Sequence, residues 1–148
     1  MTRLIEPLSA DERLALIAAA RSFLGVPFRH QGRTVKGMDC IGLIVLAFAA
    51  IGKPLRNRSD YGRLPANAKL DRELLEHFGE GFAPDYLEPQ PGDVVSMTWA
   101  KEAAHVAIIT PHPDRRIGLI HSSRDFDRVV EHGIDADWRS RIVKVYRP

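Results

Sequence analysis

The residues best suited to covalent chemistry in this sequence are its sole cysteine, Cys40, and two of its six histidines. A thiol attacks as the thiolate, so a base must take its proton. His105 opens the apolar stretch His-Val-Ala-Ile-Ile-Thr, and His121 closes the apolar stretch Ile-Gly-Leu-Ile. On neighbouring antiparallel strands the two imidazoles would meet, one abstracting the thiol proton and the other orienting it. The alternative is a small buried cysteine and two ordinary strand-end histidines.

The residues around Cys40 predict that it begins a helix. Asp39 stands where an N-cap residue belongs, and the apolar run from Ile41 to Ile51 fits a helix buried on all sides, which Gly52 ends. The unpaired N–H groups and the positive dipole end at a helix start can lower the pKa of a thiol. The same N–H groups can hold the oxyanion of a tetrahedral intermediate.

The remaining histidines are weaker candidates. His30 lies in a glycine-flanked loop near Cys40 and is expected to line a cleft. A zinc site built from His105, His121 and a carboxylate is conceivable, but the sequence has no spacing typical of zinc ligands, and we predict no metal site. Three histidines have the setting of surface or turn residues: His77, His112 and His132.

Helix signals come early in the chain. Ser9 and Glu12 have the spacing of a capping box and predict a helix of about 14 residues that ends near Gly25. Residues 53–91 predict a long connection with one short helix from Asp71 to Phe78. Prolines, among them Pro65, favour loop in the rest of this connection.

Strand signals follow Gly92. Helices first and strands later favour an α+β fold in which helices pack on an antiparallel sheet. Since no second domain or internal repeat is visible, we expect a single domain over residues 1–148. The predicted strands are Asp93 to Trp99, His105 to Thr110, Ile117 to Ser122, Val129 to Ile134 and Ile142 to Tyr146.

Composition narrows the classes of partner. The formal net charge of +2 is too balanced to favour nucleic acid. The single cysteine rules out an intramolecular disulfide. The longest apolar run is far shorter than the roughly 20 residues that cross a bilayer, so we expect no membrane partner. The first residues lack the blocks of a secretory signal, so a target outside the cell would require another route of delivery.

Five blocks of the sequence follow one another in a known order. They are Phe23-Leu-Gly-Val-Pro-Phe28, Asp39-Cys-Ile-Gly-Leu43, Pro91-Gly-Asp-Val-Val95, His105-Val-Ala-Ile108 and Ile120-His-Ser-Ser123. In this order they resemble the signature of the NlpC/P60 family of cell-wall peptidases, over nearly the whole chain. The long segment before Pro91 and the Asp-Cys-Ile-Gly variant are most similar to the branch found in phage tails and gene-transfer particles.

The resemblance implies a papain-like α+β core and a cysteine hydrolase that needs no cofactor. Cys40 would be the nucleophile, His105 the base and His121 the third, polar member of the site. The family's usual reaction is cleavage of amide bonds in peptidoglycan stem peptides. Asp39 matches the family aspartate that can bind the free amine of the stem peptide.

Two departures from the family pattern bear on specificity. Phe28 replaces the family tyrosine and so removes a hydroxyl from the cleft, and Ile41 replaces the serine after the nucleophile. We expect Asp39, Phe28 and His30 to contact the substrate. The phage branch implies synthesis in the bacterial cytoplasm, phage-tail or baseplate hub proteins as partners, and action at the cell wall from a virion or tail-like particle. Two alternatives stay open, a catalytically inactive tail-tip or hub protein and a papain-like acyltransferase or deamidase.

Overall fold

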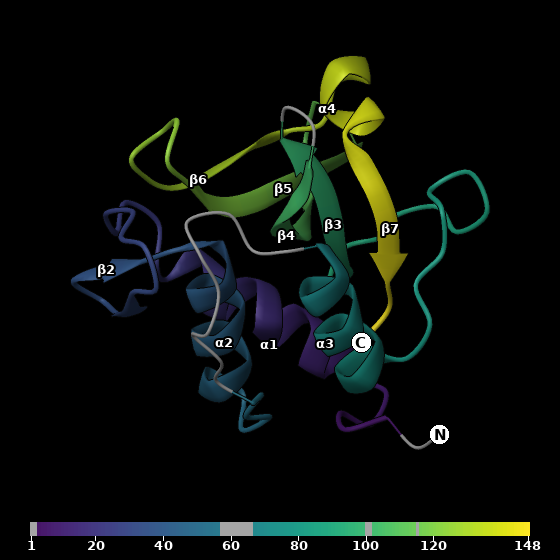
Figure 1. Cartoon of the computed structure of the whole chain (residues 1–148), viewed down its shortest axis with the longest axis horizontal. Helices are drawn as coiled ribbons and strands as arrows, with labels where there is room; N and C mark the ends of the chain where they lie inside the picture. Colours follow the sequence, from purple (N-terminus) through teal and green to yellow (C-terminus); the bar gives the residue numbers. More distant parts are fainter. Residues whose placement is uncertain (1–2, 57–66, 100–101, 115) are drawn as a thin grey trace.

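The computed structural model describes residues 3–56, 67–99, 102–114 and 116–148 and has an α+β architecture (Figure 1). The predicted fold class is therefore confirmed. The helices are α1 (Ala10–Arg21), α2 (Cys40–Ala50), α3 (Asn67–Phe78) and α4 (Ala136–Ser140). The strands are β1 (Arg33–Thr34), β2 (Gly37–Met38), β3 (Val94–Trp99), β4 (Glu102–His112), β5 (Arg116–Ser123), β6 (Arg128–Gly133) and β7 (Ile142–Tyr146).

The main sheet has five strands in the order β6-β5-β4-β3-β7, and every neighbouring pair is antiparallel. Helices α1, α2 and α3 group together below the sheet in Figure 1, and α4 lies at the opposite end. Strands β1 and β2 form a separate two-stranded hairpin just before α2. No helix in the described part of the chain is both long and apolar enough to cross a membrane.

The sheet has an apolar layer on each face because alternate side chains of a strand point to opposite sides. Val106 and Ile108 of β4 pack with α2 in a core that includes Leu43 and Phe48. The intervening residues of β4 face a second core against the other side of the sheet, with Leu119. Cys40 belongs to the first core, so the thiol lies where helix α2 meets the sheet.

Local capping signals fix the starts of the first two long helices. The Ser9 side chain accepts a hydrogen bond from the Glu12 N–H, and the Glu12 carboxylate accepts one from the Ser9 N–H, as the capping box predicts. The Asp39 side chain accepts from the Gly42 N–H at 2.7 Å and caps α2 as predicted. Gly42 has a second role, because a Cβ there would lie 2.2 Å from the Gly32 carbonyl oxygen.

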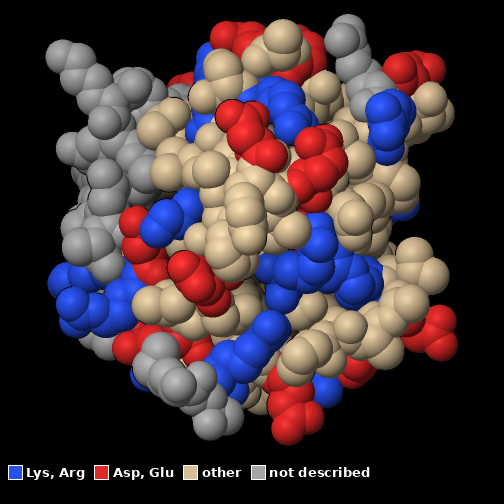
Figure 2. All heavy atoms as spheres, turned by 90° about the vertical axis from the view of Figure 1, so that its right-hand side faces the viewer, with Lys and Arg blue, Asp and Glu red and all other residues tan. Residues whose placement is uncertain are grey.

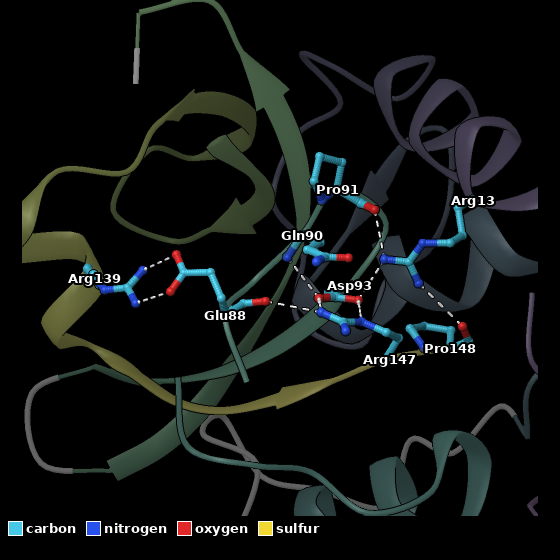
Figure 3. Close-up of polar contacts among 8 residues, drawn as sticks. All are labelled: Arg13, Glu88, Gln90, Pro91, Asp93, Arg139, Arg147 and Pro148. Carbon is cyan, nitrogen blue, oxygen red and sulfur yellow. Dashed lines mark hydrogen bonds and ion pairs between the residues drawn. The ribbon is translucent and has the colours of Figure 1, made fainter. Parts of the chain in front are cut away.

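A buried carboxylate ties the sheet to the first helix and to the C-terminal segment (Figure 3). Asp93 is fully buried and pairs with Arg13 at 2.7 Å and with both Nε and Nη2 of Arg147, at 3.1 and 2.9 Å. The backbone N–H of Gln90 also donates to it, while Arg13 reaches the Pro91 carbonyl. These contacts explain why an aspartate follows the Pro-Gly pair.

Elsewhere, Figure 2 shows acidic and basic side chains intermingled over one face of the molecule.

The structure corrects several sequence-based boundaries. Helix α1 has 12 residues rather than about 14, α3 begins at Asn67 rather than Asp71, and β4 extends at both ends. Helix α2 is not buried on all sides, because Ala49 and Ala50 are exposed. The β1–β2 hairpin and α4 lack strong periodic patterns and were not predicted. Residues 57–66 of the predicted connection, including Pro65, lie outside the described residues.

Candidate active site

The candidate nucleophile lies at the first position of α2. Cys40 is buried, with 6% of its surface exposed, and the Val106 and Ile41 backbone N–H groups hydrogen-bond its sulfur. Val106 directly follows His105, so α2 places the sulfur against the part of β4 that carries His105. Helix α2 packs on both β4 and β5, the strands that carry the two candidate histidines.

The electrostatics of the thiol differ from the sequence-based expectation. Burial raises the pKa of Cys40 from its ordinary value of 9.0 to about 12, and the negative charge of Asp39 adds to this increase. The backbone N–H groups and the positive charge of Arg33 only partly oppose it. The helix start does not produce a low pKa because burial of the thiol outweighs it, and because the cap beside the sulfur is itself a carboxylate. The resting group is thus a neutral thiol.

The predicted approach of the two histidines is confirmed. His105 Nε2 and His121 Nδ1 are 2.6 Å apart, and their rings meet edge to face. The antiparallel register of β4 and β5, in which Ile108 faces Ile120, brings the two histidines together. Nε2 of His105 is thus engaged with His121, and Nδ1 is the other ring nitrogen of His105.

Burial keeps both imidazoles neutral. His105 is 8% exposed and His121 is fully buried. Desolvation lowers the pKa of His105 to about 4, against a smaller opposing effect of Asp125 and Asp39, and it lowers the pKa of His121 to about 2. A neutral imidazole retains the lone pair that a general base needs.

The acidic residue before the nucleophile is strongly engaged. Asp39 is 4% exposed, and besides capping α2 it accepts from the Gln31 N–H at 2.9 Å and pairs with Arg33 at 3.0 Å. These contacts hold the loop that carries Phe28 and His30 beside the start of α2. Both of these side chains are half-buried, and the Arg124 guanidinium lies 5.6 Å from the centre of the Phe28 ring.

The prediction of a surface or turn residue was wrong for His77, whereas His132 is half-buried on the edge strand β6. His77 is buried, and its ring nitrogens contact the Glu73 carbonyl and the Arg56 N–H. His132, on β6, contacts His121 through Nε2 at 3.0 Å and so adjoins the candidate site. No sequence signal could have identified His132, because its place depends on the register of β6 against β5. His112 is half-buried at the end of β4.

Within the described ranges, no group of three or more His, Cys, Asp and Glu residues could hold a metal ion. The short distances between the imidazoles are those of hydrogen-bonded rings. The arrangement is suited to proton transfer next to a thiol.

Solved structures share the fold at low sequence identity. An NlpC/P60 family protein from Bacillus cereus matches with a TM-score of 0.63 and 22% identity over 97% of this chain and 42% of its own. The peptidoglycan hydrolase RipB from Mycobacterium tuberculosis matches with a TM-score of 0.64 and 18% identity, over 93% and 64% of the two chains. A P60 domain of a Mycobacterium avium subspecies paratuberculosis antigen matches with a TM-score of 0.63 and 16% identity, over 93% of this chain and 94% of its own.

Sequence comparison gives the family. A probable endopeptidase of Mycobacterium tuberculosis is 31% identical over 100 residues, which are 68% of this chain and 22% of that protein. The chain thus spans about a fifth of the length of the curated relatives it matches. The sequence model of the NlpC/P60 family matches residues 25–147, a range that contains the cysteine and all three linked histidines. This chain belongs to the NlpC/P60 family.

Proposed function

We propose that the protein is a cysteine hydrolase that cleaves amide bonds in peptidoglycan stem peptides. The observation that carries this proposal is the Cys40 thiol at the start of α2. The N–H of Val106 on β4 hydrogen-bonds its sulfur, and the preceding residue, His105, contacts His121 of β5. Relatives described as a probable endopeptidase and a peptidoglycan hydrolase support the reaction class and the substrate.

In this proposal the reaction starts from neutral groups. His105 Nδ1 takes the thiol proton as the Cys40 sulfur attacks the amide carbonyl carbon, and His121 orients the His105 ring. The proton then passes to the leaving amine, and the acyl group remains on sulfur as a thioester. A water molecule, deprotonated by the same imidazole, hydrolyses the thioester and regenerates the thiol. Coupling proton transfer to attack suits a thiol whose resting pKa is about 12.

Turnover of purified peptidoglycan and of soluble stem peptides tests the proposal. Cys40→Ala removes the nucleophile and should abolish product release while circular dichroism stays native, since Ala is a good helix former. Cys40→Ser should be nearly inactive because a hydroxyl is harder to deprotonate. His105→Ala should lose more activity than His121→Ala, whose orienting role water can partly replace. Wild-type rates in the Cys40→Ala variant would refute the cysteine mechanism.

For substrate binding we propose that Asp39 pairs with the free amine of the stem peptide and that Phe28 and His30 contact the same peptide. Arg33 already shares the charge of Asp39, so the amine would compete with an existing ion pair. Asp39→Asn retains a capping oxygen and should lose turnover of free-amine peptides in particular. Equal rates on free and N-acetylated peptides in both proteins would leave Asp39 as a helix cap alone.

We also propose that the domain acts from a phage tail or tail-like particle, with hub proteins as partners, after synthesis in the bacterial cytoplasm. The Asp-Cys-Ile-Gly variant around Cys40 supports this branch. Mass spectrometry of purified tail-like particles from a strain that carries the gene would test it. Detection of the protein in the particle fraction is expected, and its consistent absence from that fraction would contradict the proposal.

A further inference from the structure

Three imidazoles from three neighbouring strands form a continuous hydrogen-bonded chain. His105 Nε2 contacts His121 Nδ1 at 2.6 Å, and His121 Nε2 contacts His132 Nε2 at 3.0 Å. This hydrogen-bonded chain of histidines ends at the backbone, where His132 Nδ1 lies 3.0 Å from the Gly133 carbonyl oxygen. The β5–β6 register pairs Leu119 with His132, which places His132 diagonally across from His121 on one face of the sheet.

The carbonyl at the end of this chain determines its direction. A carbonyl oxygen only accepts hydrogen bonds, so His132 Nδ1 must carry a hydrogen. In a neutral imidazole the other nitrogen then accepts, so His132 Nε2 receives the N–H of His121 Nε2. By the same rule His121 Nδ1 accepts from His105 Nε2–H. The lone pair of His105 is therefore at Nδ1.

Aromatic side chains hold His121 and His132, the outer part of the histidine chain, in place. The Trp138 ring centre lies 4.4 Å from that of His132 and 5.5 Å from that of His121. Phe126 lies 5.8 Å from His121 and stacks on Trp138. The Arg141 guanidinium covers Trp138 at 4.7 Å. These contacts restrict rotation of both rings.

We propose that His132 is a positioning residue that fixes the tautomers of His121 and His105. Anchored by the Gly133 carbonyl, it presents an acceptor to His121 and thereby keeps a lone pair at Nδ1 of His105. The proposal rests on the function proposed above, in which that nitrogen takes the thiol proton. A group at this position that only donates would reverse the chain and place a hydrogen on Nδ1, where a base needs a lone pair.

Nitrogen-15 NMR of the histidine rings tests the tautomers without any substrate. At about pH 8 we expect protonated, pyrrole-type signals from Nε2 of His105 and of His121, and from Nδ1 of His132. A pyrrole-type signal from Nδ1 of His105 in the wild-type protein would overturn the proposal. This measurement stands even if the protein cleaves no stem peptide.

Two substitutions separate positioning from mere packing. His132→Gln keeps an acceptor near the Nε2 position, so His105 should keep its tautomer and kcat on stem peptide should fall by no more than about threefold. His132→Lys offers only donors, so Nδ1 of His105 should gain pyrrole character and kcat should fall roughly 10- to 100-fold with little change in KM.

His112→Gln is the matched control, since His112 lies at the far end of β4 and its Nδ1 accepts a local N–H, that of Asp114. It should leave the tautomers and kcat unchanged. Native-like folding and wild-type kcat in the Lys variant would overturn the positioning role. Correct tautomers in a wild-type protein without turnover would refute the proposed hydrolase and leave the hydrogen-bonded chain intact.

Discussion

The resting state of the single thiol gives the sharpest test of the proposed chemistry. The pKa of Cys40 rises from 9.0 to about 12, chiefly because the side chain is buried and next because Asp39 is negative. Three pH units correspond to about 4 kcal/mol against the thiolate, or about a thousandfold less thiolate at neutral pH. A papain-type ion pair at rest would instead hold the thiolate well below pH 7.

Alkylation by iodoacetamide across a pH series measures this difference. Because the chain has one cysteine, every modified molecule reports Cys40. The rate should keep rising about tenfold per pH unit to at least about pH 10, since only the thiolate reacts. The urea-unfolded protein is the control and should level off near the ordinary thiol pKa.

Changing the neighbouring charge sharpens the test. Asp39→Asn removes the negative group beside the sulfur and should move the alkylation profile to lower pH. Glu12→Gln is a matched control, because Glu12 belongs to the cap of another helix, α1. A wild-type profile that levels off below about pH 8 would refute the neutral resting thiol and the explanation by burial.

Three further predictions concern stability, measured as the free energy of unfolding in urea. Burial lowers the pKa of His105 to about 4 and that of His121 to about 2, so below pH 6.5 the unfolded chain binds more protons than the folded one. The free energy of unfolding should therefore be full above pH 6.5 and should fall by about 3 kcal/mol from His105 alone as the pH drops to 4. A flat profile would contradict the burial of neutral rings. Asp93→Asn should lower the free energy of unfolding by about 3–5 kcal/mol because it breaks the buried ion pair with Arg13. Glu88→Gln breaks the exposed pair with Arg139 and should lower it by less than about 1 kcal/mol. Equal losses would contradict the role of Asp93 as a buried, paired charge. Gly42→Ala should destabilise by about 1–3 kcal/mol because the new Cβ meets a backbone carbonyl at 2.2 Å, and a gain in stability, usual for Gly→Ala within a helix, would refute that contact.

Much of the site could be predicted from the sequence because its first signals are local. The Asp39 cap and the following apolar run specify a helix start through contacts between residues three apart, and this places Cys40. Short apolar stretches identified the β4 and β5 regions, and antiparallel pairing brought His105 to His121. These inferences needed no knowledge of how the helices pack on the sheet.

Tertiary structure alone decided the electrostatics and the outer part of the site. The pKa of Cys40 depends on burial between α2 and β4, which capping patterns do not specify, so the expected low value was wrong. His132 joined the histidine chain through the register of β6 against β5. Asp93 was paired by Arg13 and Arg147, residues 80 and 54 positions away in the chain. Sequence periodicity shows which face a side chain occupies, whereas register and long-range packing determine what lies opposite it.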